Sequence, residues 1–164
     1  MSAFPKHILD SAAEVLARAR AKGWRIATAE SCTGGLLAAA LTEIPGSSDA
    51  FERGFVTYSN EAKTELLGVP AELIAKHGAV SKEVAIAMAE GAVKRAPVQI
   101  AVSITGIAGP GGGTAEKPVG LVHFAVAHNS HAALHQECRF GDIGRSEVRM
   151  KSIETALDLL LRSL

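Results

Sequence analysis

The sequence lacks several features that mark particular classes of protein. Lys and Arg together number 17, as do Asp and Glu, so the formal net charge is zero and no excess charge attracts nucleic acid or an anionic membrane surface. The longest apolar run, residues 36–41, is far shorter than the ~18 residues that a membrane span needs. The sequence therefore predicts no nucleic-acid partner and no membrane partner.

Cysteine is also scarce. Cys32 and Cys138 are too few for a disulfide framework or a cysteine-based zinc site, and they favour a reducing compartment. The first 23 residues predict an amphipathic helix rather than a signal peptide, because Asp10 and Glu14 interrupt the apolar positions. We therefore expect a cytoplasmic protein.

Aromatic residues make up only 4% of the chain, whereas hydrophobic residues make up 48%, so Ala, Val, Ile and Leu must build the core. At 164 residues the chain has the length of one domain, residues 1–164. The hydrophobic fraction and short strands also leave room for a homo-oligomer.

Hydrophobic periodicity and turn residues predict an alternation of helices and strands. Helices are predicted over residues 5–22, 33–41, 60–67, 70–78, 81–95 and 144–163, and strands over 24–28, 51–59, 98–105, 120–127 and 131–140. This order predicts an α/β fold, a three-layer α/β/α sandwich with one mixed sheet.

The first candidate site is the segment 28–35, Thr-Ala-Glu-Ser-Cys-Thr-Gly-Gly, between a predicted strand and a predicted helix. Such a turn exposes a hydroxyl, here that of Ser31, and the helix start offers unpaired N–H groups to an anion or oxyanion. The alternative is a structural role, with Ser31 or Thr33 capping the helix. The spacing matches neither the nucleotide phosphate loop nor the α/β-hydrolase elbow.

Cys32 offers a second nucleophile beside Ser31. A helix N-terminus lowers the pKa of a thiol, which favours the reactive thiolate. A small buried filler is the commoner role for a free cysteine. The residues alone leave the choice between Ser31 and Cys32 open.

The second candidate site holds the only tyrosine, Tyr58, five residues before Lys63 at a predicted strand-to-helix junction. A lysine activates a serine hydroxyl as a base only if its site keeps the amine neutral, which requires burial or a neighbouring cation. The alternative is that Tyr58 fills an apolar edge and Lys63 is a solvated charge paired with Glu61 or Glu65.

The third candidate site is the glycine-rich loop within residues 103–114, which follows a predicted strand. Loops beyond the carboxyl ends of strands in α/β sheets bind ligands, and backbone N–H groups there can hold phosphate or ribose. The spacing does not match the dinucleotide-binding fingerprint, and a surface loop without function is the alternative. His128, His131 and His135 lack a Cys or carboxylate at ligand spacing, so no metal site is predicted.

Five segments are informative when they are taken together: AESCTGG at 29–35, VTYSNEAK at 56–63, LLGV at 66–69, GAVS at 78–81 and ITGIAGPGGGTAEKPVGLV at 104–122. In this order and at these separations they resemble the CinA C-terminal domain family. The resemblance covers about residues 5–160 and implies hydrolysis of the carboxamide of nicotinamide mononucleotide, a small-molecule substrate, to nicotinate mononucleotide and ammonia. It implies no metal and no cofactor.

The resemblance also implies roles for individual residues. It makes Ser31 rather than Cys32 the nucleophile, and it places the family's lysine and tyrosine on Lys63 and Tyr58. We expect the oxyanion to meet N–H groups around Thr33, Gly34 and Gly35, and the 5′-phosphate to meet Thr105, Gly106 and Arg145. Two other functions stay open, a non-catalytic nucleotide-binding module and an amidase for another small carboxamide.

Overall fold

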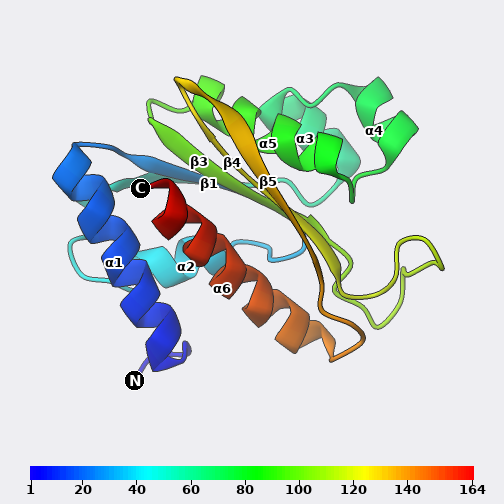
Figure 1. Cartoon of the computed structure of the whole chain (residues 1–164), viewed down its shortest axis with the longest axis horizontal. Coiled ribbons are helices and arrows are strands. Elements are labelled where there is room, and N and C mark those ends of the chain that lie inside the picture. Colours follow the sequence, from blue (N-terminus) through cyan, green and yellow to red (C-terminus); the bar gives the residue numbers. More distant parts are fainter.

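A five-stranded sheet lies between two layers of helices in the computed structural model, which describes residues 1–164 (Figure 1). The strand order is β2-β1-β3-β4-β5. Strand β1 pairs in parallel with both β2 and β3, whereas β4 pairs antiparallel with β3 and with β5. The predicted mixed sheet is confirmed.

The elements follow the predicted alternation. The helices are α1 Lys6–Lys22, α2 Leu36–Thr42, α3 Asn60–Leu67, α4 Ala71–His77, α5 Lys82–Arg95 and α6 Arg145–Ser163, with a short 3₁₀ helix at Ser47–Asp49. The strands are β1 Ile26–Glu30, β2 Phe51–Val56, β3 Ile100–Gly106, β4 Leu121–His128 and β5 His131–Arg139.

Helices α1, α2 and α6 cover one face of the sheet, and α3, α4 and α5 lie on the other (Figure 1). The larger apolar core packs Leu16 of α1 and Leu157 of α6 against Phe124 of the sheet. A smaller core packs Met88 of α5 against Ala101. The predicted three-layer sandwich is confirmed. No helix combines the length and the apolar character needed to cross a membrane.

The three parallel strands bring the candidate segments to one edge of the sheet. Their carboxyl ends are Glu30, Val56 and Gly106. Ser31 follows the first, Tyr58 lies two residues beyond the second, and the glycine-rich loop leaves the third. Segments far apart in the sequence therefore meet where α/β sheets bind ligands.

Three predicted boundaries at this edge are wrong. Strand β1 covers Ile26–Glu30 rather than residues 24–28, and all five of its residues are buried. Helix α2 begins at Leu36 rather than at residue 33, because Gly34 and Gly35 have φ values of 60° and 100°, which a right-handed helix does not accommodate. Strand β2 ends at Val56, so residues 57–59 form a connection rather than the end of a strand.

Candidate active site

Ser31 and Lys63 form a hydrogen-bonded pair. Ser31 immediately follows β1, and its backbone N–H donates to the carbonyl of Ile104 on β3, which fixes the residue against the sheet. The side-chain Oγ lies 2.9 Å from Nζ of Lys63, which belongs to α3, the helix that follows β2 in the chain. Ser31 caps no helix, since the N-cap of α2 is Gly35, so the capping alternative is wrong.

Lys63 is buried rather than solvated. Its side chain is 1% exposed and forms no ion pair, so the alternative pairing with Glu61 or Glu65 is wrong. Burial disfavours the ammonium form and lowers the pKa of Lys63 below its usual range, against a smaller opposing effect from Cys32. The site therefore favours the neutral amine that a base requires.

The remaining contacts of Lys63 fix how the amine points. Nζ donates to the carbonyl of Thr57 at 2.9 Å and to that of Tyr58 at 3.3 Å. A neutral amine has two N–H donors and one lone pair. With both donors on these carbonyls, the lone pair is left to accept the proton of the Ser31 hydroxyl. A serine nucleophile with a lysine base requires a contact of this kind.

Tyr58 and Arg145 close one side of the site. The side chain of Tyr58 is 60% exposed, so it does not fill an apolar edge. Its hydroxyl accepts a hydrogen bond from Nη2 of Arg145 at 3.0 Å, while Nη1 of Arg145 donates to the carbonyl of Gly109 at 2.8 Å. The phenol makes no hydrogen bond to Ser31 or to the Lys63 amine.

A cavity of about 290 Å³ opens in front of the Ser31 hydroxyl. Its wall is built by residues at or beyond the carboxyl ends of β1, β2 and β3, by the α4–α5 connection and by the first residue of α6: Ser31, Cys32, Tyr58, Asn60, Lys63, Ala79, Val80, Thr105, Gly106, Ile107, Ala108, Gly109, Gly111, Gly112 and Arg145. A larger hollow of about 410 Å³ between α3 and α4 holds no Ser, Cys or Lys. Ser31 and Lys63 therefore both line the smaller cavity and not the larger hollow.

Thr105, Gly106 and the glycine-rich loop form a further part of the cavity wall. The hydroxyl of Thr105 donates to the carbonyl of Ala79, which ties β3 to the α4–α5 connection. A Cβ at Gly106 would lie 2.6 Å from the side chain of Val122, so only glycine fits there. The N–H groups of Gly109, Gly111 and Gly112 donate to no protein group, which leaves them free for a bound anion.

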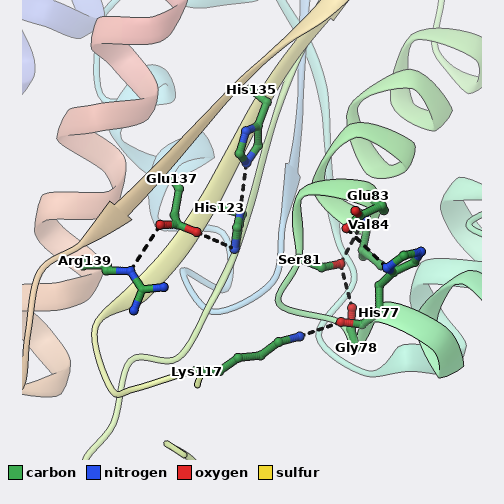
Figure 2. Close-up of polar contacts among 10 residues, drawn as sticks. All are labelled: His77, Gly78, Ser81, Glu83, Val84, Lys117, His123, His135, Glu137 and Arg139. Atoms are coloured by element: carbon green, nitrogen blue, oxygen red, sulfur yellow. Dashed lines mark hydrogen bonds and ion pairs between the residues drawn. The ribbon is translucent and has the colours of Figure 1, made fainter. Parts of the chain in front are cut away.

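Lys117 holds the far end of this loop. Its Nζ donates to the carbonyl of His77 at the end of α4, beside the point where Ser81 caps α5 (Figure 2). Ala79 and Val80, between these two anchors, line the cavity. The loop and the α4–α5 connection thus form one wall.

Thr33, Gly34 and Gly35 do not line the cavity. Thr33 is fully buried, and the N–H of Gly34 donates to the carbonyl of Ser31. Gly35 lies beside Val56. The N–H groups of Cys32, Thr33 and Gly35 have no protein acceptor, and those of Cys32 and Thr33 are the nearest to Ser31 along the chain.

The Cys32 side chain is 6% exposed and belongs to the apolar core under α2. Burial raises the pKa of its thiol to about 11, so the thiol is protonated near neutral pH. The expectation that a helix start lowers this pKa is wrong, because α2 begins four residues later.

We expect Cys32→Ala to retain nearly the whole hydrolytic rate, because a protonated thiol without a base is a poor nucleophile. The measurement is kcat for amide hydrolysis alongside the wild type. A loss comparable to that of Ser31→Ala would transfer the nucleophile role to Cys32.

The histidines form small pairs rather than a metal site. His131 lies 3.2 Å from His128, whereas His135 lies 2.9 Å from His123, which also approaches Glu137 (Figure 2). No group of three or more His, Cys, Asp or Glu side chains is arranged to hold a metal ion.

Two charged residues beside Ser31 were not selected from the sequence. Glu30, 1% exposed, accepts hydrogen bonds from the Thr33 hydroxyl and from the N–H groups of Leu37 and Ala38. Arg149 of α6 donates to backbone carbonyls of the turn after Ser31. The four-residue spacing of Arg145 and Arg149, which puts both on one face of a helix, could have indicated the second of them.

Glu30→Ala is expected to lower the free energy of unfolding by about 3 kcal/mol, because three donors would lose a charged acceptor inside the protein. Glu30→Gln, which keeps one carbonyl oxygen, should lose less. Denaturant unfolding of both variants measures the difference, and equal stability of Glu30→Ala and the wild type would refute this role.

Comparisons with known proteins show the family. The model of the CinA C-terminal domain matches residues 9–164. The chain belongs to the CinA C-terminal domain family. The crystal structure of the competence/damage inducible protein CihA from Agrobacterium tumefaciens has a TM-score of 0.97 and 52% sequence identity, covering 99% of this chain and 98% of that one. The resemblance of the sequence to the family is thereby confirmed.

The curated relatives include proteins of similar length to this chain and proteins that are much longer. The nicotinamide-nucleotide amidohydrolase PncC of Escherichia coli K12 is 53% identical over 142 residues, which cover 86% of this chain and 85% of that protein. A CinA-like protein of Syntrophobacter fumaroxidans is 53% identical over 147 residues, 90% of this chain. This chain spans about a third of the length of the CinA-like proteins it matches, 34% in that case.

Proposed function

We propose that this protein hydrolyses the carboxamide of nicotinamide mononucleotide to nicotinate mononucleotide and ammonia. The observation that carries the proposal is the buried Lys63 amine 2.9 Å from the Ser31 hydroxyl, at the wall of a cavity rich in free N–H groups. The relative PncC, named as a nicotinamide-nucleotide amidohydrolase, supports the choice of substrate.

The first half of the reaction forms an ester on Ser31. The neutral Lys63 amine takes the hydroxyl proton as Oγ attacks the carboxamide carbon, and the carbonyl electron pair moves to oxygen. The N–H groups of Cys32 and Thr33 lie nearest to receive that oxyanion. As the oxyanion collapses, the C–N bond breaks and the Lys63 ammonium returns the proton to the departing ammonia.

The second half restores the enzyme. Water attacks the ester carbon and gives a proton to Lys63. The Oγ–carbon bond then breaks, Ser31 recovers that proton, and the product leaves as nicotinate mononucleotide. Because Lys63 alone serves as base and acid in both halves, the reaction needs no metal ion.

The glycine-rich part of the wall suits the 5′-phosphate. The free N–H groups of Gly109, Gly111 and Gly112 can donate to phosphate oxygens, and Arg145, which lines the same cavity, supplies a positive charge. Tyr58, held by Arg145 and largely exposed, offers a ring face to the pyridine. A zero net charge is compatible with this arrangement, because the anion is bound by local groups rather than by a general field.

A substrate panel tests the proposal. Nicotinamide mononucleotide, nicotinamide riboside and free nicotinamide are supplied separately, and ammonia is measured. We expect release from the mononucleotide, far less from the other two, and equal amounts of ammonia and nicotinate mononucleotide. Calorimetric binding of the mononucleotide without ammonia would favour the non-catalytic binding module, and faster hydrolysis of another carboxamide would identify a different amidase.

The pH dependence of kcat/KM should report Lys63. Burial lowers its pKa, so the neutral amine becomes abundant below the ~10.4 of a free lysine, and activity should rise with pH through that lower midpoint. The unfolded chain keeps the proton up to ~10.4, so folding stability should rise over the same interval. Activity that falls as the pH rises across this interval would contradict a lysine base.

A further inference from the structure

Arg149 of α6 reaches the backbone of the turn that carries Ser31. Its Nε donates to the carbonyl of Cys32 at 3.2 Å, and its Nη2 donates to the carbonyl of Thr33 at 2.9 Å. The side chain does not line the cavity, in contrast to that of Arg145 one helical turn earlier. Arg149 therefore acts on the turn and not on a ligand.

These two contacts fix the direction of specific N–H groups. In a trans peptide the C=O and the N–H point in opposite directions, and the peptides of this turn are trans. The carbonyl of Cys32 shares its peptide group with the N–H of Thr33. When Arg149 holds that carbonyl, the N–H points away from the guanidinium and donates to no protein group.

The other side of the turn is held by Glu30. Its carboxylate accepts a hydrogen bond from the Thr33 hydroxyl at 2.6 Å. It also accepts hydrogen bonds from the N–H groups of Leu37 and Ala38 at the start of α2. These helix donors are thus unavailable to a ligand. The free donors nearest to Ser31 in the chain are the N–H groups of Cys32 and Thr33, and Arg149 fixes the second of them through the carbonyl of Cys32.

We infer that Arg149 is a positioning residue for the proposed hydrolysis. By holding the carbonyl of Cys32, it keeps the N–H of Thr33 in place for the oxyanion that forms when Ser31 attacks. Its contact with the carbonyl of Thr33 supports the next peptide group, whose N–H belongs to Gly34 and donates to Ser31. The identity of the substrate in this inference rests on the proposed function, whereas the geometry of the turn is independent of it. The two arginines of α6 are thus expected to have different roles. Arg145 should affect substrate binding, and Arg149 should affect the rate of the chemical step.

The test compares Arg149→Met with Arg162→Met, a matched change at an exposed arginine of the same helix. Arg149→Met should lower kcat for ammonia release by about 10²-fold, the typical cost of losing an oxyanion donor, with little change in KM. Arg162→Met should match the wild type. Millimolar guanidinium should restore part of the rate to Arg149→Ala, whereas methylammonium should not.

A second arm does not depend on the substrate. The rate at which a small fluorophosphonate modifies Ser31 is measured by mass spectrometry, since its phosphoryl oxygen needs the same N–H donors. This rate should fall in Arg149→Met and less in Arg149→Lys, with Ser31→Ala as the unreactive control. If the wild type is labelled but releases no ammonia, the proposed function fails while the effect of Arg149 on labelling still decides the inference.

Folding is monitored by the melting temperature of each variant. If Arg149→Met does not fold, the lysine variant carries the comparison, because it keeps the charge but loses the two-pronged contact. The inference is overturned if a folded Arg149 variant keeps both kcat and the labelling rate within about two-fold of wild type, or if only KM changes.

Discussion

Replacing Lys63 by methionine is expected to lower kcat for ammonia release from nicotinamide mononucleotide by about 10⁴-fold. Methionine fills a similar volume inside the protein but has no lone pair that takes a proton at neutral pH. Ser31 would keep its position, fixed by the hydrogen bond from its N–H to Ile104, yet its hydroxyl would be left without a base. The same variant should lose the rise of activity with pH.

The control is Lys94→Met, which changes an exposed lysine of α5. It should leave kcat and the pH profile unaltered. Melting temperatures of both variants separate a chemical effect from unfolding, because the carbonyls of Thr57 and Tyr58 lose their donor in Lys63→Met. A folded Lys63→Met with a normal rate would exclude lysine as the base.

Replacing Ser31 by alanine should reduce turnover by at least about 10⁴-fold and leave the fold intact. The Ser31 hydroxyl has Lys63 as its sole hydrogen-bond partner, and the backbone contact to Ile104 does not involve the side chain. Substrate binding should persist, because the proposed phosphate donors lie on the glycine-rich loop, a different part of the cavity wall.

Ser130→Ala, in the exposed turn between β4 and β5, is the matched control and should be fully active. Calorimetry of Ser31→Ala with nicotinamide mononucleotide should show binding without ammonia release. Loss of both binding and the melting transition would mean that Ser31 serves the fold rather than the chemistry.

Much of this architecture could be predicted from local patterns. The strand-like segment 98–105 predicts β3, and the periodic segment 81–95 predicts α5. The side chain of Ser81 caps α5 by accepting the N–H of Val84. The order of these elements was sufficient for the three-layer α/β fold with a mixed sheet. The motifs around Ser31, Lys63 and Gly106 were sufficient to predict the family, which the family model confirms.

The burial of Lys63 could not be predicted from its own helix. Glu61 and Glu65 lie close to it in sequence and suggest a solvated charge, but the Lys63 side chain faces the carboxyl end of β1, 32 residues earlier in the chain. The start of α2 was misplaced for a related reason. The turn depends on left-handed glycines and on Glu30, whose carboxylate serves as the helix cap from outside the helix.

The measurement that tests the central claim most directly is rapid-quench mass spectrometry of the wild-type protein during turnover of nicotinamide mononucleotide. The account predicts a nicotinate mononucleotide ester on the peptide that contains Ser31, formed at least as fast as ammonia is released and absent from Ser31→Ala. A modified Cys32 in place of Ser31, or steady ammonia release by Ser31→Ala, would contradict it.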